Sequence, residues 1–593
     1  MFIRNLFTYN CLYKIVILLI IIANYRFNIT SITYYYNKII FSECTYIVAT
    51  VIDIVGIFKN TIIMDHMVYV QPKLFWGDVG LTLIIDLTPV LLLFILLTVL
   101  KMSSWKATLI TTIVTLILAI AVGVPADSAV SAWLIGALFG LWSISWLIFW
   151  GITWFNTWRL TGHLDAFTSW MLKNITNDVR IIALTIAWAL GALIEGLIGF
   201  GTPWAYLVPM LISLGLPTIR ALTIMAVANT APVAYGAFGI PIVTLAGVAG
   251  LPLVATSGAV AHIVAVLAFI IVFVILALID GWRGIKEAWP AALIGALGYV
   301  LGQFTTALYI GPYLADVVGS ILAFLFLVGL AKVWRPKNIV SPPAIRVNDV
   351  KDRGAVTRAW ASLILFVTIM GLWNSPISPL KWVVATFSVP AYSEVLQKQV
   401  SVSYAFNVLT TGTSALVAWL ITLPLMKAGA KDVVNALKTT WKQTWGAVLT
   451  GIFVISLAFV FNYSGMAYSL AYLTMGLGLW FLIISPFLGW LGAALTGSNT
   501  SSNALFGPFQ AAMGQLLGLP PLLLPSLQTV GGELGKPVAP QTVSAGVSTT
   551  EYVRREGEVI RNNMKYSIAL VFVLIIIGIL YWLIYPWPFF VSK

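Results

Sequence analysis

The sequence predicts an all-α polytopic membrane protein, with about 12 spanning helices and two re-entrant hairpins in an inverted repeat of the ion-transporter type. The first observation is composition: of 593 residues, 60% are hydrophobic and 9% are charged, and the mean hydropathy is +0.97. A soluble protein of this size needs more charge to cover its surface. The second is that apolar runs of about 18 residues or more recur between short polar loops. The third is that each half contains apolar segments interrupted by Gly and Pro, as in secondary transporters.

Charge and the scarcity of Cys and His exclude several other classes of protein. The net charge of +13 would suit a nucleic-acid binder, but the basic residues lie in loops between apolar runs. The positive-inside rule accounts for that placement, so no nucleic acid is expected as a partner. Only Cys11, Cys44 and three histidines are present, which argues against a disulfide framework or a Cys- or His-based metal site. The sequence shows neither the paired acids nor the nucleophile–base pair that would indicate an enzyme, and no cofactor is predicted.

Most of the apolar runs are plain candidate spans. They cover residues 79–100, 106–123, 131–153, 258–279, 289–308, 313–331, 360–376, 404–425, 445–461 and 566–586. Two longer apolar regions, 181–250 and 467–550, contain many Gly, Pro, Ser, Thr and Asn residues that a plain spanning helix would not need. Each of these regions is predicted to form a re-entrant hairpin followed by one broken spanning helix.

The basic loops orient the chain and divide it into units. We expect the loops at 101–106, 283–286, 332–358, 427–442 and 554–565 to lie in the cytoplasm, with the spans in the plasma membrane. Residues 79–279 then form a first transporter repeat, and residues 359–593 form a second, inverted repeat. Residues 280–358 form a two-helix insert with a basic loop. The alternative is a chance similarity among many helices.

Residues 1–63 differ in composition from the rest of the chain. They are crowded with Ile, Tyr, Asn and Thr, contain no Pro or Trp, and have one glycine, Gly56. Residues 15–23 are too short to span a bilayer, and no cleavage site for a signal peptide follows. Either the segment is an extra N-terminal anchor, or the start is mis-assigned and Met64 or Met67 begins the working protein. We favour the second reading.

Four interrupted segments are the predicted position of the transport site. They are GALIEGLIGFGTP (191–203) and ANTAPVAYGAFGIP (228–241) in the first half, and TGSNTSSNALFG (496–507) and GGELGKPVAPQ (531–541) in the second. Non-helical backbone at membrane depth is tolerated only inside protein or along a wet cavity. Half-helix starts attract anions there. The candidate substrate-binding residues are Thr202, Asn229, Thr230, Ser498, Asn499, Thr500, Ser501, Ser502, Asn503, Lys536 and Gln541.

The run from Ser498 to Asn503 is predicted to be the tip of a hairpin that lines a small polar cavity. The alternative is helix packing through Ser and Thr side chains, which is common in membranes. Packing rarely needs six consecutive polar positions, so we favour the cavity.

Two charged residues within these segments are candidates for opposite roles. Glu195 lies in an apolar run between Gly191 and Gly196, where an ionised carboxylate is costly and usually functional, and it is the predicted proton-coupling residue. A structural hydrogen bond to a helix start is the alternative. Lys536 is expected to meet the carboxylate of a substrate, and its alternative is a salt bridge with Glu533.

Three other polar residues fall in or near the predicted spans. A lone histidine in a span is more often a packing residue than a proton relay, so His262 is not placed in the site. Asp86 and Asp316 are assigned no role.

The motifs of these segments resemble the lactate permease family. The similarity rests on the four segments together with NYSGMAYSLA (462–471) and SPFLGWLGAALTGSNTSSNALF (485–506), and it runs from about residue 80 to the last span. It implies uptake of lactate, and often glycolate, by proton symport across a prokaryotic plasma membrane. It also implies kinship with ion-transporter folds that use paired hairpins and elevator-like motion.

Two positions depart from the pattern of that family. Asn499 stands where the family is expected to have an aspartate, so the resemblance places any coupling role of that carboxylate most plausibly at Glu195. At 535–541 this chain has Pro, Val and Ala at 537–539, and lacks one hydroxyl that the family usually carries. These departures mainly affect the shape of the pocket, and through it the identity of the substrate.

The charge of the site favours a small monocarboxylate. One lysine and the half-helix starts balance about one negative charge, whereas a dicarboxylate would need several cations. The main alternative is a sodium-coupled carboxylate carrier, because Ser498-Asn499-Thr500 resembles a motif of such carriers. A channel suits two occluding hairpins less well. The sequence leaves open whether the protein is a monomer or a homodimer.

Overall fold

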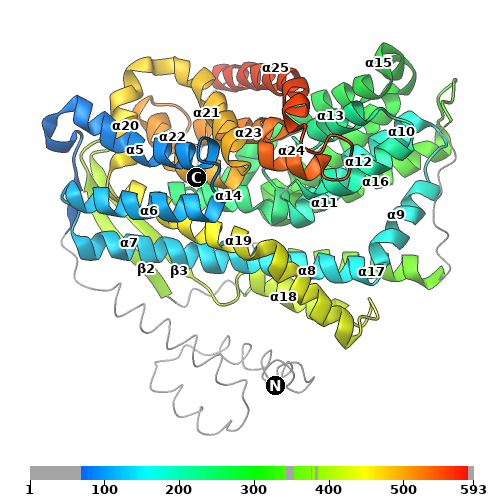
Figure 1. The fold of residues 1–593 in the computed structure, drawn as a ribbon, viewed down its shortest axis with the longest axis horizontal. Helices are drawn as coiled ribbons and strands as arrows, with labels where there is room; N and C mark the ends of the chain where they lie inside the picture. Colours follow the sequence, from blue (N-terminus) through cyan, green and yellow to red (C-terminus); the bar gives the residue numbers. More distant parts are fainter. Residues whose placement is uncertain (1–67, 200, 342–352, 376, 381–384, 585–593) are drawn as a thin grey trace, which may run out of the picture.

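The computed structural model describes residues 68–199, 201–341, 353–375, 377–380 and 385–584. It is helical apart from one small sheet (Figure 1). The segment 1–63 and the alternative starts Met64 and Met67 lie outside the described residues.

The first half of the described chain contains helices and helical turns up to residue 333. They are η1 (Phe75–Gly77), α5 (Val79–Thr98), α6 (Ser104–Ala121), α7 (Ala126–Phe139), η2 (Gly140–Ser145), α8 (Trp146–Leu160), α9 (His163–Lys173), α10 (Val179–Leu184), η3 (Thr185–Leu190), α11 (Gly191–Ile198), α12 (Thr202–Ser213), α13 (Thr218–Ala228), α14 (Gly236–Ala249), α15 (Leu253–Tyr309), η4 (Pro312–Leu314) and α16 (Ala315–Val333).

The second half adds two strands and a further set of helices. They are α17 (Arg353–Asn374), β2 (Ala385–Ser393), β3 (Lys398–Phe406), α18 (Thr411–Thr422), α19 (Ala430–Tyr463), α20 (Met466–Thr474), η5 (Met475–Trp480), α21 (Phe481–Thr496), α22 (Asn499–Leu516), α23 (Leu523–Gly535), η6 (Lys536–Val538), α24 (Pro540–Val547) and α25 (Glu556–Leu583).

Ten of the helices in the described residues are long and apolar enough to cross a membrane. One of them, α15, runs for 57 residues but is broken at Asp280 and Gly281, where Gly281 has a φ of 61°. This break lies next to the basic loop expected at 283–286, so α15 supplies two consecutive helices. The prediction of a polytopic helical membrane protein is therefore confirmed, while the count of about 12 spans stays a prediction.

The small sheet corrects two expectations: an entirely α-helical fold and a span over 404–425. Strand β1 (Tyr69–Gln71) pairs in parallel with β2, and β2 pairs antiparallel with β3, with Val389 opposite Val402. Inward-facing and exposed residues alternate along 399–406, which is the period of a half-buried strand. The apolar character of 404–406 therefore belongs to β3, and the helix that follows begins at Thr411.

Neighbouring elements pack around one long helix. Helix α19 packs along α6, α7 and α8, while α7 also contacts β2 and β3. Figure 1 shows α5, α6 and α7 side by side on the left, next to these strands. Glycines allow the closest helix contacts: α21 and α23 meet where Gly489 lies against the carbonyl of Gln528 and Gly531 against that of Pro486. Small residues at helix contacts are typical of membrane proteins.

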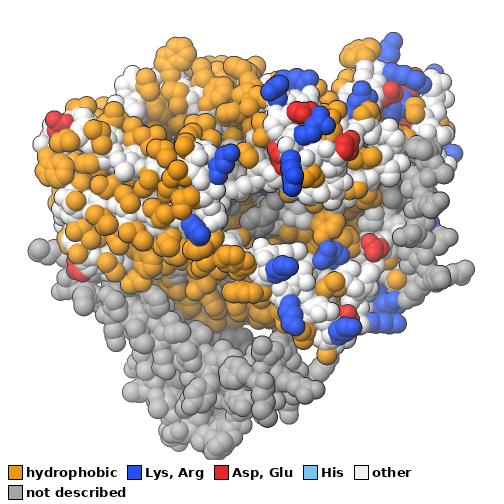
Figure 2. All heavy atoms as spheres, viewed as in Figure 1, with side chains coloured by type: hydrophobic (Ala, Val, Ile, Leu, Met, Phe, Trp, Pro, Cys, Tyr) orange, Lys and Arg blue, Asp and Glu red, His pale blue; other side chains and the backbone are white. Residues whose placement is uncertain are grey.

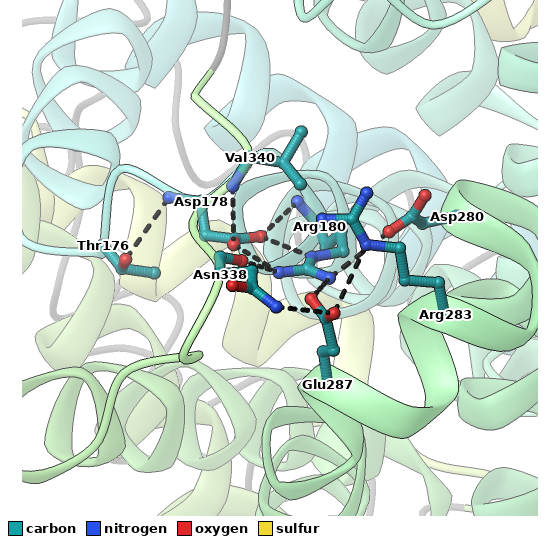
Figure 3. A network of polar contacts seen from close by, with 8 residues as sticks. All are labelled: Thr176, Asp178, Arg180, Asp280, Arg283, Glu287, Asn338 and Val340. Atoms are coloured by element: carbon teal, nitrogen blue, oxygen red, sulfur yellow. Dashed lines mark hydrogen bonds and ion pairs between the residues drawn. The ribbon is translucent and has the colours of Figure 1, made fainter.

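A buried arginine anchors the start of the first long interrupted region. The guanidinium of Arg180 in α10 is paired with Asp178 at 2.8 Å, Glu287 at 2.8 Å and Asp280 at 3.3 Å, and it donates to the carbonyl of Asn338 (Figure 3). Asp280 and Glu287 flank the break in α15. One side chain thus fastens α10 to that break and to the segment after α16.

The surface fits a lipid bilayer. Large apolar side chains remain exposed on the long helices, including Ile84 on α5, Ile117 on α6 and Ile576 on α25. Apolar side chains cover most of the left and centre of the face in Figure 2, while Lys and Arg gather at its centre and right. Contact with acyl chains accounts for exposed apolar helix faces, which a soluble protein would avoid.

Candidate functional site

The four interrupted segments meet around a cavity of about 700 Å³. Helix α11 contributes Glu195, and the break between α13 and α14 contributes backbone around Gly236. The turn between α21 and α22 contributes residues 496–501, and the break after α23 contributes Lys536. Helices α6 and α19 also line the cavity, with Lys106 among their lining residues. Segments hundreds of residues apart thus form one site.

Turns at two glycine-rich positions create the two helical hairpins of the site. Between α11 and α12, Gly199 and Gly201 have φ of 72° and 71°, a conformation that side chains with a Cβ rarely adopt. Between α21 and α22, Gly497 has a φ of 70°, and the hydroxyl of Ser498 accepts the N–H of Ser501 as the cap of α22. Both turns place the end of a helix next to the cavity.

An ion pair joins the two halves of the chain inside the site. The ammonium of Lys536 lies 2.6 Å from Oε1 of Glu195, and their side chains are 7% and 1% exposed. Gly236 lies against this pair, because a Cβ there would be 3.0 Å from Oε1. The second oxygen of Glu195, Oε2, is buried with no hydrogen-bond partner among the described residues.

The alternative pairing of Lys536 with Glu533 is absent from the described ion pairs. Glu533 instead accepts the backbone N–H of Ala234 at 2.9 Å, in the break between α13 and α14. Each of the two neighbouring charged residues at the end of α23 therefore holds a different element of the first half. Glu195 and Lys536 both line the cavity, and Glu533 does not.

The polar run in the second hairpin divides into two parts. Ser498, Asn499, Thr500 and Ser501 line the cavity, and the Asn499 amide donates to the carbonyl of Thr529 at 3.1 Å. Ser502 and Asn503 do not line it.

The side chains of Ser502 and Asn503 serve helix packing. The hydroxyl of Ser502 donates to Gly489, and the amide of Asn503 donates to Pro241 and Thr529. Helix packing, the alternative role for the run from Ser498 to Asn503, therefore applies to its last two residues.

The other candidate residues are spread more widely. Gln541 lines the cavity and donates to the hydroxyl of Ser104 at 3.1 Å. Thr202, Asn229 and Thr230 lie near the breaks but are not lining residues: Thr202 donates to Gly199, Thr230 donates to Val227, and Asn229 accepts from Trp204. These three side chains stabilise the breaks.

The sequence pattern does not predict that α6 and α19 contribute to the cavity. Ser104 and Lys106 on α6 and Gln443 on α19 line it. No signal in the sequence separates Lys106 from the other basic residues of the loops. His262 hydrogen-bonds to Gly258 at 2.7 Å, and neither it nor Asp86 lines the cavity.

The arrangement offers one exchangeable charge and several neutral hydrogen-bonding groups. A ligand carboxylate that enters the cavity meets the ammonium of Lys536, and the hydroxyls and amide at 498–501 line the same cavity. No group of three or more His, Cys, Asp or Glu residues able to hold a metal ion occurs in the described part of the chain. The site thus has the chemistry to bind a small anion reversibly.

Comparisons with known proteins agree on one family. A family model described as L-lactate permease matches residues 82–585. The chain is 32% identical to the glycolate permease GlcA of Escherichia coli K12 over 539 residues, which is 85% of this chain and 96% of that protein. It is 32% identical to the L-lactate permease of the same strain, over 69% of this chain and 79% of that protein. It is 30% identical to the L-lactate permease of Bacillus subtilis 168, over 86% of this chain and 98% of that protein.

A solved structure, the YdaH transporter of Alcanivorax borkumensis, superimposes with a TM-score of 0.44 and 17% identity. The match covers 77% of this chain and 88% of that one.

Proposed function

Because the chain belongs to the L-lactate permease family, we propose that it takes up L-lactate, glycolate or a related small 2-hydroxy monocarboxylate by proton symport. It is a multi-pass integral protein of the plasma membrane. The relatives that carry the names of lactate and glycolate permeases support the substrate class.

The buried pair between Glu195 and Lys536 is the observation that carries this proposal. Both side chains line the cavity, so a substrate carboxylate that enters it competes with Glu195 for the ammonium. Of the two lysines that line the cavity, Lys106 is exposed and Lys536 is buried. One buried ammonium balances one carboxylate, which favours a monocarboxylate over a dicarboxylate. Ser498, Asn499 and Thr500 are near enough to the same cavity to bind a 2-hydroxyl group, with Gln541 at its edge.

Proton coupling follows from the cost of a buried charge. When the substrate takes Lys536, Glu195 loses its partner, and leaving one member of a buried pair unpaired costs about 3–5 kcal/mol. Taking up a proton on Glu195 removes that cost. The substrate and one proton therefore bind together, and the loaded site keeps the net charge of the empty one. Movement of the site across the membrane is then equally possible in both states.

The movement itself is proposed to be of the elevator type. The hairpins α11–α12 and α21–α22 are taken as re-entrant, and the halves 79–279 and 359–593 as an inverted repeat. The insert 280–358 joins them. The cavity has Lys106 at its wall, so it faces the side of the basic loops, which the positive-inside rule assigns to the cytoplasm.

Counterflow of labelled L-lactate tests the substrate class. Purified protein in proteoliposomes loaded with unlabelled L-lactate is expected to take up the labelled substrate transiently. External glycolate should compete, while acetate, which lacks the hydroxyl, and malate, which has a second carboxylate, should compete weakly. Absence of lactate counterflow, or stronger competition by malate, would contradict the proposal.

A sodium-coupled carrier is the second candidate. Its supporting observation is that Oδ1 of Asn499 and Oδ1 of Asn503 are both buried without hydrogen-bond partners in the described residues. Amide oxygens are suitable ligands for a hard cation. Uptake measured at constant pH, with sodium replaced by choline, separates the two: proton symport predicts no change, and sodium coupling predicts loss of uptake.

A further inference from the structure

A second buried carboxyl group, that of Asp316, packs against the helix that carries Glu195. Asp316, in the first turn of α16, is fully buried and does not line the cavity. Its Cβ lies against Gly196, where a Cβ added to the glycine would be only 2.8 Å away. Glycine at 196 therefore allows the side chain of Asp316 to reach the helix that carries Glu195, next to that residue in the chain.

Asp316 is held by one hydrogen bond and has one free oxygen. The hydroxyl of Tyr299 on α15 donates to its Oδ1 at 2.7 Å, while its Oδ2 is buried without a hydrogen-bond partner among the described residues. Glu195 Oε2 is in the same condition. Asp316 interacts electrostatically with Glu195 and with Lys536. Two unpartnered carboxyl oxygens thus belong to side chains that flank the same glycine.

The other titratable groups near Asp316 come from the elements packed around it. Tyr235, just before α14, and Glu533 on α23 interact with it electrostatically, as does Tyr299 on α15. Turn η4 carries Tyr313, whose hydroxyl hydrogen-bonds to Thr411. Segment η3 has no titratable side chain.

The balance of buried charges indicates which of the carboxyl groups in this cluster are protonated. Three buried carboxyl groups, Glu195, Asp316 and Glu533, share one ammonium, that of Lys536. Ionising all three would leave two uncompensated negative charges at membrane depth, which is strongly unfavourable. Lys536 pairs with Glu195, so Asp316 and Glu533 carry protons while the pair is intact. Glu533 accepts the N–H of Ala234, whereas Asp316 packs against Gly196, so Asp316 is the acid next to the helix of Glu195.

We propose that Asp316 is the proton donor to Glu195 in the transport cycle, an inference that rests on the proposed proton symport. Glu195 Oε2 and Asp316 Oδ2 are not hydrogen-bonded to each other in this structure, so the transfer requires that Glu195 turn toward Asp316 once the substrate carboxylate has taken Lys536. The O–H bond at Asp316 Oδ2 then breaks and an O–H bond forms at Glu195 Oε2. The Asp316 carboxylate keeps the hydrogen bond from Tyr299 until solvent reprotonates it, a step that belongs to another state of the cycle because Asp316 is fully buried here.

Comparing exchange with accumulation in Asp316→Asn tests this inference. Asparagine resembles the neutral acid, leaves the Glu195–Lys536 pair intact, and cannot donate a carboxyl proton. Lactate counterflow is expected to stay within about twofold of the wild type, while accumulation driven by a pH gradient slows at least about tenfold. Tyr299→Phe, which retains the acid but loses its positioning hydroxyl, should slow accumulation by a smaller factor and spare counterflow.

Asp86→Asn is the matched control. Asp86 is also fully buried, lies in a spanning helix and accepts a hydroxyl hydrogen bond from Ser469 at 2.7 Å, yet it lies outside the cavity. It should change neither rate. Accumulation at the wild-type rate in Asp316→Asn, or a fall of both rates by the same factor, would overturn the inference. If Asp316→Asn does not reach the membrane, unchanged accumulation in Tyr299→Phe overturns it instead.

The outcome for Glu195 separates this inference from the function on which it rests. If Glu195→Gln loses accumulation while Asp316→Asn retains it, Asp316 is not the donor and proton symport through Glu195 stands. If Glu195→Gln also accumulates lactate normally, the coupling mechanism itself is wrong, and the inference about Asp316 falls with it.

Discussion

The two hairpin turns of the site have similar backbones and opposite chemistry. Both turn through glycines with positive φ, Gly199 and Gly201 in the first hairpin and Gly497 in the second. The first presents the carboxylate of Glu195, paired with Lys536. The second presents only neutral hydroxyls and an amide, from Ser498 to Ser501.

We infer that the two hairpins have different roles, one in balancing the charge of the substrate and the other in orienting it. In the proposed cycle the first hairpin and Lys536 decide whether an anion binds and whether a proton accompanies it. The second hairpin decides how the rest of the molecule lies. Changing charged residues should therefore alter uptake and coupling, whereas changing the neutral residues should alter affinity and pH dependence.

The largest effect is expected at the cation. Lys536→Gln should abolish saturable lactate uptake, because the substrate carboxylate loses the only buried ammonium that the described residues supply to the cavity. Lys438→Gln, at an exposed lysine on α19, is the matched control and should transport normally. Near-normal affinity in Lys536→Gln would assign the substrate carboxylate to another group.

The same change tests the ion pair through stability. Glu195 left alone in Lys536→Gln should destabilise the folded protein by about 3–5 kcal/mol or force it to bind a proton. The double variant Glu195→Gln with Lys536→Gln should regain much of the stability in thermal unfolding, yet remain inactive. Equal destabilisation in the single and double variants would show that the pair contributes little.

A smaller effect is expected from adding charge to the second hairpin. Asn499→Asp replaces the amide that donates to the carbonyl of Thr529 by a carboxyl group. The carboxyl group can make the same hydrogen bond only when it is protonated. Uptake should continue, and its rate should depend more steeply on pH because a second group titrates in the site. Asn499→Ala removes the amide without adding an acid and should not steepen the pH profile. Identical profiles in both variants would remove the chemical distinction between the hairpins.

The smallest effect is expected at the helix cap. Ser498→Ala removes the hydroxyl that accepts the N–H of Ser501, which should cost about 1 kcal/mol of stability. Thermal unfolding in detergent measures the loss, and lactate affinity should weaken only modestly. Complete loss of uptake in a stable variant would mean that Ser498 binds the substrate more strongly than the charged pair does.

The sequence was sufficient to predict a polytopic helical membrane protein, while the role of the four interrupted segments as the transport site stays a prediction. Long apolar runs and four Gly/Pro-interrupted segments indicated a helical transporter, and the structure brings these segments together. The partner of Lys536 could not be predicted from the sequence, because Glu195 is 341 positions away while Glu533 is only three residues from the lysine. Only the tertiary fold decides which carboxylate faces the lysine.

Two other errors have simple geometric causes. A helix turns about 100° per residue, so the polar run from Ser498 to Asn503 cannot face one cavity along its whole length. The last two residues therefore point into the helix contacts. The length of the apolar run 404–425 predicts a spanning helix and not the strands β2 and β3. The signal for a strand is the alternation along 399–406, which has a period of two.

The central claim, that Glu195 carries the proton that accompanies the substrate, is tested most directly by Glu195→Gln in proteoliposomes. Counterflow and accumulation of labelled L-lactate are measured on the same preparation, with and without an imposed pH gradient. Glutamine matches the protonated glutamate in size, so the loaded carrier should still move and counterflow should persist. Accumulation against a concentration gradient should vanish, because no proton is bound and released. Accumulation that still follows the pH gradient in this variant would contradict the account.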